Sequence, residues 1–214
     1  LYSCLDQLNN SRVNIATVED PAEIQLAGAN QVSVNERAGL TFASTLRALL
    51  RQDPDILMVG EIRDLETARI ALQAAQTGHL VLSTLHTQDA PSTLMRLHDM
   101  GVEPFHLAAS VLLITAQRLV RRLCPHCKTR PTQAPLWEAV GCSLCREGFA
   151  GRIGLFQVMP LSPTLKDMLL QQTDAPSLAA QARREGIQTM REDGLEKVQQ
   201  GLTTLTEVEQ ATHD

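Results

Sequence analysis

The chain has 214 residues, of which 43% are hydrophobic and 20% are charged, and its formal net charge is -5. This length is enough for one sizeable hydrophobic core with a small appended unit, and the composition argues against an intrinsically disordered chain. The acidic balance argues against nucleic acid as the main partner, because a surface that follows a phosphate backbone needs a basic excess.

The first half of the chain alternates predicted helices with predicted strands. Helices are expected at residues 1–10, 40–52 and 64–77, and strands at residues 12–21, 54–60 and 79–86. The run from Ile56 to Val59 does not alternate apolar with polar residues, so it is expected to be covered on both faces, as central parallel strands are. Strand–helix alternation is typical of right-handed βαβ units. The predicted fold class is therefore α/β, with a largely parallel sheet flanked by helices.

The second half is expected to be mainly helical around a cysteine-rich segment. Helices are expected at residues 89–100 and 104–116, one more strand at residues 151–162, and further helical segments over the last quarter of the chain. Glycine and threonine residues punctuate these final segments, as helix caps do. The apolar stretch 106–116 is expected to be a buried helix, because a membrane-spanning helix needs about 20 residues.

Four of the five cysteines form two CxxC pairs separated by a short loop. These four residues are Cys124, Cys127, Cys142 and Cys145. The spacing matches a structural zinc site, in which four thiolates surround the metal tetrahedrally. Disulfides are the alternative, but the sequence has no export signal and disulfides are uncommon in reducing compartments. His126 is expected to face solvent, because four sulfurs already complete the metal shell, and Cys4 has no partner.

Three of the predicted strands end in polar residues. They are Glu19 and Asp20, with Glu23 close by, at the first, Gly60 and Glu61 at the second, and the segment from His79 to His86 with Ser83, Thr84 and Thr87 at the third. In open α/β sheets, ligands bind outside the carboxyl ends of the strands, so these side chains are expected to line one crevice. The alternative is that Gly60 and Glu61 begin an ordinary loop, with Asp64 capping the helix that follows.

A crevice with this lining suits phosphoryl chemistry. That chemistry needs an acid that holds magnesium through water or orients an attacking water, and a cation that neutralises charge developing on the γ-phosphate. Glu61 and Glu23 suit the acid roles. Arg47 and Arg51 suit the cation role, since residues four apart share one face of a helix.

Each of these assignments has a structural alternative. The two arginines could form a solvated basic stripe that pairs with neighbouring carboxylates. His79 could be a core or cap residue, and His86 could simply end its strand. The pattern alone predicts a crevice of nucleotide size and does not name the nucleotide.

Three longer stretches carry a specific resemblance. They are TVEDPAE at residues 17–23, the segment from GLTFAS to STLHT at residues 39–87, and QRLVRRLCPHC at residues 117–127. They resemble the bacterial type II secretion and type IV pilus assembly ATPases, a superfamily with a RecA-like core. The resemblance continues to about residue 208, so it covers nearly the whole chain.

The resemblance implies roles for particular residues. Glu19, Asp20 and Glu23 match the family's aspartate box, Gly60 and Glu61 its Walker B region, His79 and His86 its histidine box, and Arg47 and Arg51 its phosphate-contacting arginines. Glu19, Asp20, Gly60 and Thr84 are expected to bind nucleotide. The four cysteines match the zinc-binding insertion of the assembly and secretion branch. Gln157 stands where the family usually has an acidic residue.

The resemblance also implies an activity, cofactors, an oligomeric state and a cellular location. The expected function is an ATP-hydrolysing motor that uses ATP, Mg²⁺ and Zn²⁺, forms a hexameric ring, and grips a platform protein at the cytoplasmic face of the bacterial inner membrane. No nucleic-acid partner is expected. The expected organisation is a RecA-like core at residues 1–117, a zinc unit with the following strand at residues 118–158, and a helical subdomain at residues 159–214.

One family motif does not occur in the chain. The glycine-rich phosphate loop GxxxxGK followed by serine or threonine is absent, and the opening LYSCLDQLN, which lacks a methionine, resembles the helix that follows that loop. Because loop amides and the lysine hold the β- and γ-phosphates, the chain is expected to be a fragment that does not hydrolyse ATP alone. The alternative function is a zinc-stabilised module that docks onto an inner-membrane platform.

Overall fold

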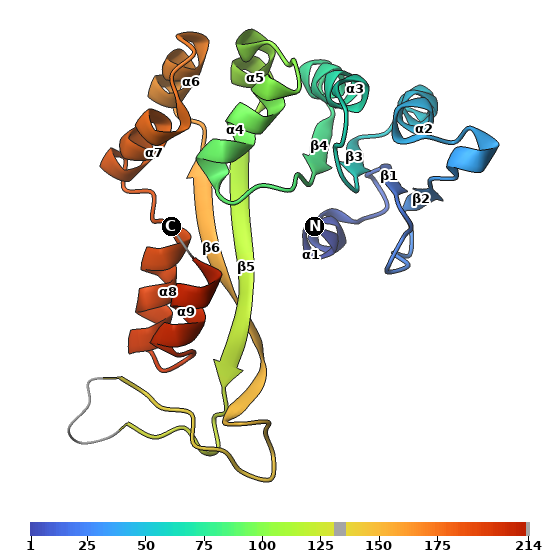
Figure 1. Ribbon diagram of the computed structural model, residues 1–214. Coiled ribbons are helices and arrows are strands. Elements are labelled where there is room, and N and C mark those ends of the chain that lie inside the picture. The colour runs from blue at the N-terminus through green and yellow to red at the C-terminus, as the bar shows by residue number, and fades with distance from the viewer. Residues whose placement is uncertain (131–135, 213–214) are drawn as a thin grey trace. The chain divides into compact units, whose positions relative to one another are not determined.

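The computed structural model describes residues 1–130 and 136–212 (Figure 1). These residues form two compact units. The first unit contains residues 1–86, 93–112 and 166–173, and the second unit contains residues 87–92, 113–165 and those from Asp174 onward. Within the described ranges, no helix combines the length and the apolar character needed to cross a membrane.

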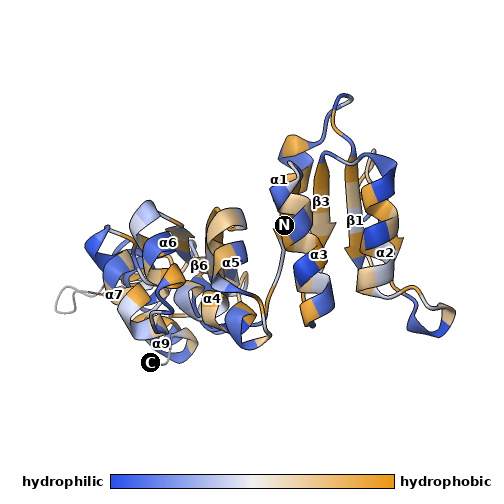
Figure 2. Ribbon diagram, turned by 90° about the horizontal axis from the view of Figure 1, so that it is seen from above, coloured by the Kyte–Doolittle hydropathy of each residue, from blue (hydrophilic) through white to orange (hydrophobic). Residues whose placement is uncertain are grey.

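The first unit is built on a four-stranded parallel sheet. Its strands are β1 (Ile15–Glu19), β2 (Asn30–Ser33), β3 (Ile56–Val59) and β4 (Leu80–Ser83), in the order β2-β1-β3-β4. Every residue of β1 and β3 is buried, and Figure 2 shows these two strands coloured as hydrophobic. The expected parallel sheet with a buried central strand is therefore confirmed.

Helices cover both faces of this sheet. On one face are α2 (Phe42–Leu49) and α3 (Leu65–Gln76), and on the other is α1 (Tyr2–Leu8). The 3₁₀ turns are at Glu36–Ala38 and Leu50–Gln52, and helices α4 (Ala90–Asp99) and α5 (Pro104–Ser110) follow β4 in the chain. Because side chains alternate along a strand, Leu57 and Val59 pack with α2 and α3, whereas Ile56 and Met58 pack with Leu5 of α1. Asp64 accepts the Thr67 N–H at the start of α3, the cap named in the alternative interpretation of residues 60–64.

The second unit is organised around a long antiparallel ribbon. Strand β5 (Leu113–Leu123) pairs with β6 (Phe149–Pro160), and the helices that follow are α6 (Pro163–Leu170), α7 (Ala175–Arg184), α8 (Met190–Gln199) and α9 (Leu205–Ala211). Val120 and Leu155 of the ribbon form one core cluster with Val198 of α8 and Val208 of α9. Figure 1 shows α8 and α9 alongside the ribbon.

The expected helix over residues 104–116 is wrong beyond Ser110. Helix α5 ends there and β5 begins at Leu113, so the apolar stretch changes from helix to strand within three residues. The β-branched residues of this stretch favour a strand once β6 supplies its pairing partner. Leu112 and Leu113 are exposed, not buried. The expected boundaries near residues 117 and 158 fall inside β5 and β6.

The outer edges of the ribbon are satisfied by the α8–α9 region. On β5, the Leu123 N–H donates to the Leu202 carbonyl at 2.9 Å, and Thr203 Oγ1 donates to the Arg121 carbonyl at 2.8 Å. On β6, the Phe156 N–H donates to the Asp193 carboxylate at 2.8 Å. A two-stranded ribbon alone is marginally stable and offers open edges, so this region supplies both a core and edge partners.

Gln157, at a position where the resemblance implies an acidic residue, is buried on β6. Its Oε1 accepts the Ala90 N–H at 2.9 Å, at the start of α4 and within the second unit. A neutral amide oxygen can make this bond as a carboxylate can. The departure from the family pattern therefore preserves an acceptor for a buried backbone donor.

Glu207 of α9 binds the ribbon through Arg121. Its Oε1 accepts from Arg121 Nη2 at 2.7 Å and Nε at 3.0 Å, and its Oε2 accepts the Arg121 N–H at 2.9 Å. Burial alone would raise the pKa of Glu207, but these hydrogen bonds outweigh it and lower the pKa. The carboxylate is therefore ionised in the folded chain.

Replacing Glu207 by glutamine should destabilise the second unit at neutral pH by about 1–3 kcal/mol, because a charge-assisted pair is lost. The contribution of the ionised Glu207 is present above pH 4.5, its ordinary carboxyl pKa, and is lost as the pH falls through the lower folded pKa. The acid dependence of the free energy of unfolding, measured by urea denaturation, should therefore be shallower in Glu207→Gln. Glu209→Gln is the control, since Glu209 is exposed on the same helix. Equal effects of the two substitutions would contradict the assignment.

Candidate functional site

The carboxyl ends of β1, β3 and β4 meet at one edge of the sheet. The Gly60 N–H donates to the Val18 carbonyl at 2.7 Å, and Thr84 Oγ1 donates to the Gly60 carbonyl at 2.6 Å. A Cβ at position 60 would lie 3.3 Å from the Val18 oxygen and from the Glu19 Cα. Glycine at this position therefore permits the close approach of two strand ends.

Glu61 lies at the centre of a charged cluster on this edge. Its Oε2 is 3.2 Å from His86 Nε2, and its Oε1 pairs with Arg63 Nη2. Arg63 Nη1 is also 3.3 Å from an Asp20 carboxylate oxygen. The Arg63 hydrogen bond lowers the pKa of Glu61 against the opposing effect of burial, and His86 adds to the lowering. An ionised Glu61 is thus brought together with His86 and Asp20.

Arg63 is a component of this cluster that sequence reasoning did not assign. It joins the ends of β1 and β3 through Asp20 and Glu61, and its guanidinium lies 5.9 Å from the centre of the Phe42 ring. The available signal was an arginine two positions after a strand-end glutamate. Alternation along an extended segment places such residues on the same side, where they can pair.

The three acids of the aspartate box occupy different environments. Glu19 is 4% exposed and accepts hydrogen bonds from side chains inside the first unit. Asp20 faces Arg63. Glu23 is exposed, and its carboxylate makes no ion pair with any described residue. Glu23 is therefore the acid of this segment that is free to meet a ligand.

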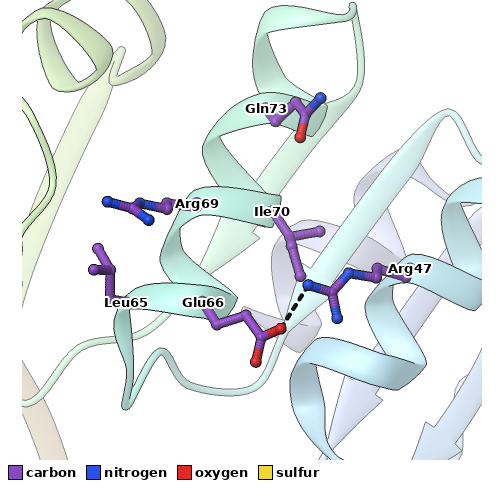
Figure 3. Close-up of a pocket in the computed structure, with 6 residues that line it drawn as sticks. All are labelled: Arg47, Leu65, Glu66, Arg69, Ile70 and Gln73. Atoms are coloured by element: carbon purple, nitrogen blue, oxygen red, sulfur yellow. Dashed lines mark hydrogen bonds and ion pairs between the residues drawn. The ribbon is translucent and has the colours of Figure 1, made fainter.

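Arg47 lies in α2, which ends at Leu49, and Arg51 lies in the 3₁₀ turn that continues from it. Arg47 pairs with Glu66 at 2.6 Å, as Figure 3 shows, and both side chains are more than half exposed. The pair borders a pocket of about 530 Å³ between α2 and α3. Its lining residues are Arg47, Leu65, Glu66, Arg69, Ile70 and Gln73.

Arg51 and His79 lie toward the amino ends of the strands. Gln52, next to Arg51, has its carbonyl bound by the side chain of Asn14, which immediately precedes β1. His79 immediately precedes β4, and its Nδ1 is 2.9 Å from the Ala74 carbonyl at the end of α3. Of the two predicted histidines, the structure brings His86 to Glu61 and gives His79 the contacts of a helix end.

Four cysteines at the far end of the ribbon form a cluster suited to a metal. Their sulfur atoms all lie within 4.8 Å of one another. Cys127 and Cys145 are 3.6 Å apart, and Cys124 and Cys142 are 4.0 Å apart. A tetrahedral zinc with Zn–S bonds of about 2.3 Å requires sulfurs roughly 3.8 Å apart, so the donor set fits zinc. All five cysteines are free thiols, which disfavours the disulfide alternative.

The cysteine cluster is tied to the ribbon and to the α8–α9 turn. The Cys124 N–H donates to the Gly148 carbonyl at 2.8 Å. Lys128 Nζ donates to the Gly201 carbonyl at 2.7 Å and lies 4.7 Å from the centre of the Trp137 ring. The first CxxC pair is therefore held by a contact to the start of β6 and by a contact to the α8–α9 turn. His126 is exposed and outside the sulfur set, as expected.

The carboxyl edge of the parallel sheet carries an acid, an arginine and a histidine, and the end of the ribbon carries four clustered cysteines. These features define an α/β protein with a candidate ligand-binding edge and a candidate metal site. The chain matches the model of the family described as "Type II/IV secretion system protein" over residues 1–210, and it belongs to that family. The expected family is thus confirmed.

Individual relatives agree with this membership. The chain is 50% identical to the type IV pilus assembly ATPase PilB of Acinetobacter baylyi, with all of this chain and 40% of the relative covered. It is 45% identical to the type II secretion system ATPase E of Vibrio cholerae, with all of this chain and 46% of the relative covered. The chain therefore spans less than half of the length of these two relatives.

Among solved structures, the chain is similar to the pilus retraction motor PilT with bound ADP. The TM-score is 0.78 at 30% identity, covering all of this chain and 57% of that chain. A second similar structure is the ATPase DotB of Legionella pneumophila, with a TM-score of 0.67 at 25% identity, covering 94% of this chain and 52% of that chain. The α/β fold is confirmed by these likenesses.

Removing the Arg63 charge should raise the pKa of Glu61, because Arg63 supplies the largest influence that keeps this carboxylate ionised. Titration of the Glu61 side-chain carboxyl by ¹³C NMR in Arg63→Gln would measure the change. Arg63→Lys, which keeps the charge, should show a smaller increase. An unchanged Glu61 pKa in Arg63→Gln would refute the pairing.

Proposed function

We propose that this chain carries the acid and histidine side of the nucleotide site in an ATP-hydrolysing motor for type IV pilus assembly or type II secretion. The observation that carries the proposal is the ionised Glu61, held between Arg63 and His86 where β1, β3 and β4 end. The names of the relatives, which are pilus assembly and secretion ATPases, support the same activity.

Each residue of this edge has a proposed part in hydrolysis. Glu61 helps to place Mg²⁺ and water, and Glu23 polarises the attacking water. Asp20, Gly60 and Thr84 form the floor of the nucleotide site through the contacts between the strand ends. Bound Mg²⁺ would neutralise charge that develops on the phosphates.

Arg47 is proposed to stabilise the transferred phosphoryl charge, and His86 is proposed to act beside Glu61. Arg51 and His79, predicted from the sequence for the same site, lie toward the amino ends of the strands and have no proposed part in this edge. The Arg47–Glu66 pair is exposed, and such pairs contribute little to stability, so Arg47 can exchange Glu66 for a phosphate at small cost. The proposed assembly is a hexameric ring of this chain at the cytoplasmic face of the bacterial inner membrane. Nucleic acid is not a proposed partner.

We propose that Cys124, Cys127, Cys142 and Cys145 hold a structural Zn²⁺ that fixes the end of the ribbon. The spacing of their sulfurs supports this assignment. A second candidate function is docking of this unit onto an inner-membrane platform protein. The large exposed apolar side chains near the second cysteine pair favour it, since Val140 is 60% exposed and Leu144 is 68% exposed.

A chimera tests the motor proposal. This chain would replace the homologous segment of the Acinetobacter baylyi relative, so that the relative supplies the remaining parts of an ATPase. The chimera should hydrolyse ATP, and Glu61→Gln should lower turnover by about 100-fold or more while nucleotide binding persists. Glu36→Gln is the control, because Glu36 is exposed in the 3₁₀ turn before α2. Turnover of Glu61→Gln equal to that of Glu36→Gln would remove Glu61 from the mechanism.

The zinc proposal predicts one metal ion per chain by elemental analysis. Cys124→Ser should lose that zinc and lower the melting temperature, because metal binding free energy contributes directly to folding of the unit. Cys4→Ser is the matched control, since Cys4 is exposed in α1. Unchanged zinc content and melting temperature in Cys124→Ser would show that the assignment is wrong.

A further inference from the structure

A hydrogen-bond network lies behind the charged edge of the first unit, centred on Glu19. Glu19 Oε1 accepts from Thr17 Oγ1 at 2.6 Å and from Gln31 Nε2 at 3.0 Å, and Glu19 Oε2 accepts from the Tyr2 hydroxyl. The residue is 4% exposed. Three donors therefore occupy most of the acceptor capacity of a carboxylate that is shielded from solvent.

The same network reaches the loop that carries Glu23. The Tyr2 hydroxyl oxygen accepts the N–H groups of Glu23 at 3.1 Å and Ile24 at 3.3 Å. Gln31 Nε2 donates to the Ile24 carbonyl at 3.0 Å, and Gln31 Oε1 accepts the Leu26 N–H at 2.7 Å. Two side chains thus provide partners for four backbone groups of a loop that has no regular structure of its own.

The Tyr2 hydroxyl donates its hydrogen bond to Glu19 and accepts hydrogen bonds from the loop. A phenol has one hydrogen to donate and two lone pairs to accept with, and all three are used here. Glu19 fixes the hydrogen on its own side, so the lone pairs point toward the loop. Burial and the hydrogen bond to Glu19 raise the pKa of Tyr2, which keeps the donor protonated.

We infer that Glu19, Tyr2 and Gln31 are positioning residues that hold the Glu23 loop beside the Glu61 cluster, and that Glu19 does not itself contact nucleotide. This inference rests on the proposed function for the role of Glu23. It replaces the expected nucleotide contact of Glu19 with a structural link. The hydroxyl of Tyr2 transmits the position of α1 to the loop, because it is bound to both β1 and the loop backbone.

Tyr2→Phe tests the link, because it removes the hydroxyl and keeps the ring. The amides of residues 23 and 24 should exchange with deuterium about fivefold faster or more, the factor expected for one lost hydrogen bond, while residues 56–59 of β3 keep wild-type rates. Asp6→Ala, an exposed substitution on the same helix, is the control. Wild-type exchange at residues 23 and 24 in Tyr2→Phe would overturn the inference.

Gln31→Met tests the second side chain that binds this loop. It provides an independent test if Tyr2→Phe fails to fold. Exchange should quicken at the Leu26 amide, whose acceptor is lost. Unchanged exchange at residue 26 would count against the network.

A kinetic readout separates positioning from general stability. In the chimera with the Acinetobacter baylyi relative, Tyr2→Phe should lower kcat by about 10- to 100-fold through misplacement of Glu23, with little change in KM for ATP. A rise in KM with kcat unchanged would overturn the positioning role. If no chimera hydrolyses ATP, the proposed function fails, whereas the exchange result on Tyr2→Phe still decides whether the network holds the loop.

Discussion

The close approach of β1 and β3 at their carboxyl ends determines the geometry of the first unit. The Gly60 N–H meets the Val18 carbonyl where any Cβ would crowd the Glu19 backbone. The parallel register then brings the segments after both strands together, and Arg63 spans them. Without this approach, the acids of two separate segments would not share one arginine.

The acids and donors at this edge fall into two layers with different roles. The outer layer contains Glu61, which contacts both Arg63 and His86, and the side chains of these two partners are more than half exposed. The inner layer contains Glu19, whose hydrogen bonds all go to residues of the unit itself. An acid of the family's aspartate box can therefore serve the site by shaping a loop, since a buried carboxylate with three donors has little capacity left for a ligand.

The sequence predicted the parts of this molecule that depend on local pattern. The uninterrupted apolar run of β3 indicated a buried strand, and the cysteine spacing indicated a cluster that the structure assembles. Strand β2 was missed because its four residues are half-exposed and largely polar, so they carry no strand periodicity. Arg63 and Tyr2 were missed because their roles come from partners that lie far along the chain or across a strand end. Residues 111–116 were assigned to a helix because an apolar run does not reveal that β6 will pair with it.

The edges of the ribbon depend on residues that come much later in the chain. Arg121 and its partner Glu207 are separated by 86 positions. At a synthesis rate of about 5–20 residues per second, roughly 4–17 s pass between the appearance of β5 on the ribosome and that of α9. During this interval the nascent ribbon has bare backbone donors and acceptors, so the newly made chain passes through a stage in which chaperones or early contacts must keep it from pairing with other chains.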